Sequence, residues 1–79
     1  MKDALLYIIS SIVENPENVE VEELEENGFV NFTVTVAKED MGRVIGKEGK
    51  IIKAVRNVMK IPAMKKEKRI EISLKEIAE

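Results

Sequence analysis

Seventy-nine residues with a net charge of −2 form one small domain, and such a chain buries only about 60% of the surface that it exposes when unfolded. It contains no Cys and no His, which excludes disulfides, thiol nucleophiles, imidazole bases and the usual zinc ligands. Its longest apolar stretch, residues 4–13, is too short to span a membrane, so we expect an unprocessed, cytoplasmic protein without a cofactor.

The first element in the chain is predicted to be a helix over residues 3–14, with Asp3 as its N-cap. The Asn15-Pro16 pair ends it, because a residue before proline is pushed out of the helical region. The apolar stripe over residues 4–13 is wider than one buried face, so part of it is expected to form an interface. Four of its residues define the helical spacing: Leu5, Ile8, Ile9 and Ile12.

Two strands follow, joined by a tight turn. Residues 19–26 predict a strand at the sheet edge, in which Leu24 breaks the alternation and indicates a bulge or a ragged end. Asn27-Gly28 is typical of a type I′ hairpin turn. The next strand is the clearest in the chain, because apolar and polar residues alternate strictly. Its apolar residues are Val30, Phe32, Val34 and Val36.

Two helices are predicted next, separated by a glycine-bounded turn. Asp40 is expected to cap a short helix that ends near Ile45, and a second helix begins after Gly49. Pro62 is expected to break or kink the second helix. Its predicted inner face comprises Ile51, Ile52, Val55, Val58 and Met59. Its predicted outer face comprises Lys53, Arg56, Asn57 and Lys60.

A charged linker, residues 65–68, leads to a last strand in which Ile70, Ile72 and Leu74 alternate with polar residues. The order of elements is therefore α-β-β-α-α-β. Three strands and three helices predict a two-layer α+β domain over residues 1–79, with the helices on one face of a three-stranded sheet.

The charges are segregated along the chain. Residues 1–41 contain two basic and ten acidic side chains, whereas residues 42–69 contain ten basic and two acidic ones. Residues 70–79 contain one Lys and three Glu. Such segregation creates a local positive field that the overall acidity conceals, and this field favours an anionic partner. The alternative is two solvated faces of opposite charge.

The turn between the two predicted helices reads Gly46-Lys47-Glu48-Gly49. Glycines at both ends allow positive φ and the close approach of another backbone. The second helix starts here, and the free N–H groups and positive dipole end of a helix attract anions. Lys47, Lys50 and Lys53 add positive charge, so the predicted ligand is a phosphate backbone.

Two other glycine-lysine motifs are excluded by spacing. A Walker A loop requires G-x-x-x-x-G-K-[ST] after a strand. Here only three residues separate Gly42 from Gly46, Glu48 stands at the Ser/Thr position, and the preceding segment is predicted to be helical. The Rossmann motif G-x-G-x-x-G is absent as well.

The run from Ile45 to Ile52, Ile-Gly-x-x-Gly-x-x-Ile, resembles the signature of KH domains, whose GXXG loop clamps about four nucleotides. The α-β-β-α-α-β order is that of the type II KH fold. The whole chain also resembles the small bacterial KhpA (YlqC-like) family, with Asn15-Pro16-Glu17 and Val55-Arg56 as further points of similarity. Ile61-Pro62 departs from the family pattern, in which the helix usually continues, and leaves the path of residues 61–68 open.

The resemblance implies a role for each loop position. Gly46 and Gly49 would let the RNA backbone approach, Lys47 would contact phosphate, and Glu48 would be a tolerated, solvent-facing position. Ile45 and Ile52 would line a groove for unstacked bases, or else belong to the core. Three residues would extend the positive wall, or else form an ordinary solvated face together with Lys60: Lys50, Lys53 and Arg56.

The resemblance also implies non-catalytic binding of single-stranded RNA and a global RNA-binding or RNA-chaperone role. It implies pairing as a homodimer or as a heterodimer with a KhpB (Jag-like) protein. An interaction or ribosome-associated module with little RNA affinity is the alternative, and in that case the two glycines form only a tight helix–helix turn. The sequence leaves two roles open for four further cations, either as RNA contacts or as solvated side chains: Lys65, Lys66, Lys68 and Arg69.

Overall fold

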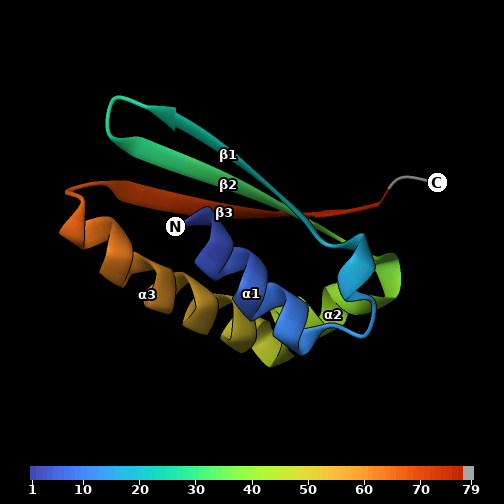
Figure 1. Ribbon diagram of the computed structural model, residues 1–79. Helices are drawn as coiled ribbons and strands as arrows, with labels where there is room; N and C mark the ends of the chain where they lie inside the picture. Colours follow the sequence, from blue (N-terminus) through green and yellow to red (C-terminus); the bar gives the residue numbers. More distant parts are fainter. Residues whose placement is uncertain (78–79) are drawn as a thin grey trace.

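Three helices cover one face of a three-stranded mixed sheet in the computed structural model, which describes residues 1–77 (Figure 1). The predicted α-β-β-α-α-β order and two-layer α+β architecture are confirmed. The single domain predicted over residues 1–79 includes residues 78–79, which lie outside the described part. The helices are α1 (Lys2–Ile12), α2 (Met41–Ile45) and α3 (Lys50–Lys65), and the strands are β1 (Glu20–Glu26), β2 (Phe29–Val36) and β3 (Arg69–Glu76).

The central strand of the sheet is β2, which pairs antiparallel with β1 and parallel with β3. Its alternation places every second side chain in the core, as predicted, because the helices cover only one face. Asn27 and Gly28 join β1 to β2 with φ angles of 51° and 78°, and positive φ at both positions fits the predicted type I′ turn. The fully buried residues of β2 are Val30, Phe32, Val34 and Val36.

Strand β1 is the edge strand that the sequence predicted, but it has neither the bulge nor the ragged end that were predicted as alternatives. The β1–β2 register runs without interruption from Glu20 opposite Thr35 to Glu26 opposite Phe29. Leu24 lies on the opposite face from the buried Val21 and is 63% exposed. The broken alternation therefore reflects an apolar side chain on the uncovered face of the sheet and no change in pairing.

Helix α1 supplies Leu5 and Ile9 to the core, and both are fully buried. The prediction that Asp3 caps this helix is wrong, because Met1 occupies the N-cap and Asp3 lies in the first turn. A carboxylate in the first turn still complements the helix dipole. The helix ends at Ile12, two residues before the predicted end. No helix within residues 1–77 has the length and apolar character needed to cross a bilayer.

Helix α3 differs from its prediction in two respects. Its buried residues are Val55, Met59 and Ala63, whereas the predicted inner residues Ile51 and Val58 are exposed. The helix also continues through Pro62 to Lys65 and does not break there. An interior proline removes one backbone hydrogen bond. Burial of Ala63, directly after Pro62, helps to offset that loss, because this side chain reaches the core only if the helix continues.

Candidate nucleic-acid interface

The turn between α2 and α3 is built from two glycines that have different surroundings. Gly46 ends α2 with φ 74° and ψ 179°, and its N–H donates to the Gly42 carbonyl at 2.9 Å. A Cβ added to Gly46 would lie 2.5 Å from Cγ1 of Ile51. Gly46 is therefore required both by its positive φ and by the side chain packed against it.

Gly49, by contrast, faces open space. Its φ is 75°, and a Cβ added to it would have no atom within 4 Å. The residues between the glycines form a 3₁₀ turn (Lys47–Gly49) in which Glu48 also has positive φ, at 57°. One side of the turn is thus packed against α3, and the other side leaves room for a second backbone to approach.

Positive charge surrounds the open side of the turn. Lys47 and Lys50 are exposed, and Lys50 begins the 16-residue helix α3. The first N–H groups of a helix have no intrahelical acceptor, and the dipole makes this end partly positive. Glu48 is exposed as well, in agreement with its predicted solvent-facing position.

The two flanking isoleucines have different degrees of burial. Ile45, the last residue of α2, is 37% exposed. Ile52 is half-buried and packs against the core. The two alternatives for these residues, groove surface or core, therefore have different outcomes. Ile45 presents an apolar surface beside the turn, whereas Ile52 contributes to both the core and the surface.

A basic stripe continues from the turn along α3. Lys53, Arg56 and Lys60 recur at positions i, i+3 and i+7, which places them on one side of the helix. That side faces β3, since Nη2 of Arg56 lies 3.9 Å from Oε1 of Glu71. Within residues 1–77, Nε of Arg56 is buried without a hydrogen-bond partner, and Lys53 and Lys60 form no salt bridge.

The four cations at the end of α3 are also placed by the structure. Lys65 is the last residue of α3 and Lys66 caps it. Nζ of Lys68 forms a 2.6 Å salt bridge with Oε1 of Glu25, and the N–H of Arg69 donates to the Gly28 carbonyl at 3.0 Å. Residues 65–69 thus form a short turn held against the β1–β2 hairpin, which settles the path of the chain after Pro62.

Sequence reasoning missed the role of Asp40, which was predicted to cap α2. It occupies the N-cap position without a capping hydrogen bond and is fully buried. Its carboxylate instead accepts hydrogen bonds of 3.0 Å from the N–H groups of Glu14 and Asn15 and from Nδ2 of Asn15. Nε of Arg43 lies 3.8 Å away. An Asp before a short helix gives the same sequence signal in both arrangements.

The environment of Asp40 changes its acidity. Burial alone would raise the pKa of this carboxyl, but the hydrogen bonds from Glu14 and Asn15 and the charge of Arg43 outweigh burial and lower the pKa below its usual value. Asp40 therefore stays ionised in the folded protein. It ties the segment after α1 to the start of α2, which leads directly into the glycine turn.

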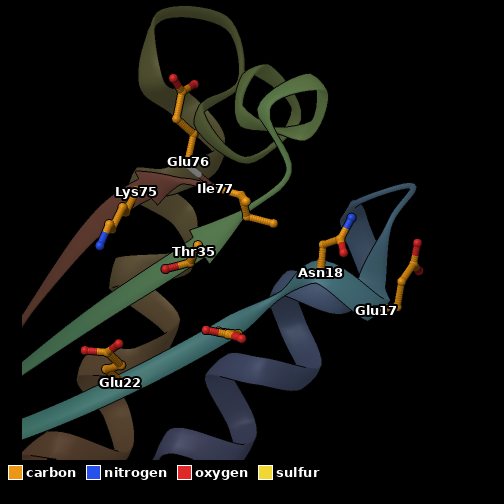
Figure 2. Close-up of a pocket in the computed structure, with 8 residues that line it drawn as sticks. Glu17, Asn18, Glu22, Thr35, Lys75, Glu76 and Ile77 are labelled. Atoms are coloured by element: carbon orange, nitrogen blue, oxygen red, sulfur yellow. The ribbon is translucent and has the colours of Figure 1, made fainter. Parts of the chain in front are cut away.

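The uncovered face of the sheet is chemically different from the glycine turn. A shallow hollow of about 280 Å³ lies at one end of this face (Figure 2). Carboxylates dominate its lining, and Lys75 is its only cation. Its acidic residues are Glu17, Glu20, Glu22 and Glu76. Phosphate would be repelled here, which leaves the α2–α3 turn and the basic stripe as the candidate interface.

The chain matches known proteins over nearly its whole length. The family described as "KhpA/KhpB, KH domain" matches residues 2–74. A protein of Clostridium acetobutylicum named "RNA-binding protein KhpA" is 42% identical over 74 residues, which cover 94% of this chain and 99% of that protein. Proteins of the same name from Chlamydia caviae and Listeria monocytogenes are 38% and 37% identical, over 96% and 94% of this chain and 97% of each relative.

Proposed function

Because the chain belongs to the KhpA/KhpB family of KH domains, we propose that it binds single-stranded RNA, without catalysis, through the turn from Gly46 to Gly49. The observation that carries the proposal is the asymmetry of this turn. Gly46 is packed against Ile51, whereas Gly49 is open and lies at the positive start of α3. An RNA backbone can approach the open side and place a phosphate near free N–H groups.

The neighbouring side chains have separate roles in this proposal. Lys47 and Lys50 attract the phosphates, and Lys53 and Arg56 extend the attraction along α3. Ile45 and Ile52 offer apolar surface to bases that have left the stack. Glu48 points to solvent, and its negative charge partly opposes the approach of phosphate to the turn. The names of the relatives support RNA as the ligand.

In the cell, we propose a single KH domain over residues 1–79 that acts in the cytoplasm as a global RNA-binding protein or RNA chaperone. A clamp for about four nucleotides makes few contacts and binds weakly. Such a clamp suits transient contact with many RNAs better than stable binding to one.

Weak individual binding also favours pairing, because two linked sites gain effective concentration. Part of residues 4–13 was expected to form the interface, but α1 uses most of its apolar residues in the core, and Tyr7 alone of the large ones is mainly exposed, at 76%. A better surface lies on α3, where four exposed residues recur along one stripe: Ile51, Ala54, Val58 and Ile61. We assign a homodimer, or a heterodimer with a KhpB-type protein, to this stripe.

The same stripe supports the second candidate function, an interaction or ribosome-associated module with little RNA affinity. An exposed apolar stripe on a small protein is typical of a protein-binding surface. The two functions differ in what the glycine turn does, so RNA binding must be measured separately from assembly.

The RNA proposal is tested by comparing single-stranded with double-stranded RNA of equal length over a range of salt concentrations. We expect the single strand to bind more tightly, because the A-form duplex offers no free bases. With two to four phosphates contacted, log K should fall with log salt at a slope of roughly −1.5 to −3, taking about 0.7 per phosphate. Equal affinity for both RNAs, or affinity independent of salt, contradicts the proposal.

The assembly proposal is tested by sedimentation of Val58→Lys, alone and with a KhpB-type protein. A lysine in the apolar stripe should shift the equilibrium toward monomer, because its charge would have to be buried in the interface. Leu24→Lys is the matched control, since Leu24 is an exposed apolar residue on the opposite layer. A wild-type protein that is monomeric in both samples would refute the assembly.

A further inference from the structure

A second hollow, of about 300 Å³, lies at the opposite end of α3 from the glycine turn. It is formed where the end of α3 meets the beginnings of β2 and β3, with Lys60 and Met64 on the helix side and Phe29 and Ile70 on the strand side. Its volume is at the lower end of the range for small-ligand pockets. Of these residues, Lys60 also belongs to the basic stripe, and the others lie outside the candidate interface.

The apolar part of this hollow suits a flat ring. Phe29 is an aromatic residue that is 38% exposed, and Met64 beside it is 72% exposed. Exposed aromatic side chains are the usual platforms on which single-stranded nucleic acids stack their bases, and such stacking tolerates any base. Phe29 and the flexible Met64 therefore both offer apolar surface to a base in this hollow, without reading its identity.

The rim of the hollow is positive. Lys60 and Arg69 line it and form no salt bridge within residues 1–77. Lys68 also lines it, but its charge is compensated by Glu25 at 2.6 Å. Lys65 and Lys66 are exposed in the adjoining turn. A phosphate next to a stacked base would thus lie near at least two cations, Lys60 and Arg69, that no salt bridge within residues 1–77 neutralises.

A row of basic residues links the hollow with the proposed clamp. The basic stripe of Lys53, Arg56 and Lys60 runs from the glycine turn toward it, and Lys60 belongs to both. Ala63 in the hollow wall lies fourteen positions after Gly49, and at 1.5 Å per residue this is about 21 Å. A stacked strand advances about 3.4 Å per nucleotide, so about six steps span that distance.

We propose that this hollow, centred on Phe29, is a second RNA subsite that binds a base of the same strand beyond the four nucleotides at the glycine turn. The subsite rests on the proposed RNA binding and adds to it a longer footprint. A second copy of the chain is a poorer occupant, because a symmetric contact here would bring the cationic rims of two copies together.

The test measures binding of a four-nucleotide and a ten-nucleotide RNA of the same repeated base to the wild type and to Phe29→Thr. Threonine retains the preference for a strand but removes the ring. We expect the wild type to bind the longer RNA more tightly. The variant should lose about fivefold or more of its affinity for the longer RNA and none for the shorter one. Leu24→Thr, which alters an exposed apolar residue outside the hollow, should change neither affinity.

A charge variant keeps the test decisive if Phe29→Thr does not fold. Arg69→Gln should make the slope of log K against log salt less steep by about 0.7 for the longer RNA, at 0.7 per phosphate, and leave the shorter RNA unchanged. Lys75→Gln is the matched control, because Lys75 is an exposed cation on the same strand and outside the hollow.

Each contrary outcome has a distinct meaning. Equal loss for both RNA lengths shows that Phe29 supports the clamp only through the fold, and this overturns the subsite. Unchanged binding of the longer RNA by both variants overturns it as well, while the clamp stands. If the variants no longer form the dimer but keep their RNA affinity, the hollow belongs to protein assembly and the subsite is overturned. A wild type that binds neither RNA overturns the proposed function together with the subsite.

Discussion

Within residues 1–77, two tight turns contain more than one residue with positive φ, and only one of these turns has the features of a binding site. Asn27-Gly28 joins two strands, and its neighbours Glu25 and Glu26 are acidic. The turn from Gly46 to Gly49 joins two helices, contains Lys47 and is followed by Lys50. Both Gly28 and Gly49 face open space. Backbone conformation and free space are therefore shared, and the positive charge and the helix start distinguish the second turn.

The largest expected effect tests whether the two turns also differ in how tightly their glycines are packed. Gly46→Ala should lower the free energy of unfolding by about 2–4 kcal/mol, because the new methyl group adds overpacking against Ile51 to the cost of positive φ. Gly28→Ala should cost only about 1–2 kcal/mol, since its φ of 78° is unfavourable but nothing lies within 4 Å. Urea denaturation of both variants measures the difference. Equal costs would mean that Ile51 moves aside freely.

The next effect tests the charge difference. Lys47→Asp with Glu48→Asp retains both glycines and reverses the charge at Lys47. RNA affinity should fall at least about tenfold, which requires about 1.4 kcal/mol, while the thermal midpoint stays nearly constant because both residues are exposed.

The matched control for this variant is Glu25→Gln with Glu26→Gln, at the hairpin turn. It should leave RNA affinity unchanged within twofold, although it removes the partner of Lys68. Undiminished RNA binding by the aspartate variant with an intact fold contradicts the clamp. Lost RNA binding with assembly preserved contradicts a function in protein interaction alone.

The smallest effect concerns the support of the turns. The carboxylate of Asp40 fixes the start of α2, whereas no such buried carboxylate adjoins the hairpin turn within residues 1–77. Because the folded state lowers the pKa of Asp40, its stabilisation is fully present above the unfolded pKa near 3.8 and is lost as the pH falls through the folded pKa. Asp40→Asn should lower the thermal midpoint by several degrees at pH 7 and by less below pH 3.8. Melting curves across this pH range measure both shifts, and a constant difference between variant and wild type would count against this role.

Local patterns in the sequence predicted most of the fold. The alternation of β2 and the Asn27-Gly28 turn depend on neighbouring residues, so the sequence alone predicts them correctly. The outcome at Leu24 depends on which sheet face the helices cover, and the continuation of α3 through Pro62 depends on burial of Ala63. Neither condition is visible in a local pattern.

The candidate site was predictable to a similar extent. The resemblance to KH domains identified the glycine turn and its lysines, and the structure brings these residues together at the start of α3. Two features could be identified only from the three-dimensional structure, because both join residues far apart in the sequence. Asp40 binds Asn15 across 25 positions, and Phe29 meets Lys60 in one hollow.

The parallel pairing of β2 with β3 has a consequence for how the protein folds. The β1–β2 hairpin closes through two residues, whereas β3 can pair with β2 only after the chain between Val36 and Arg69 has been brought back. That chain contains α2, the glycine turn and α3. Contacts with a large sequence separation form slowly, since loop closure must precede them. We therefore expect the hairpin to form early and the glycine turn to reach its final position late, so that a nascent chain has no clamp until residues 69–76 have left the ribosome.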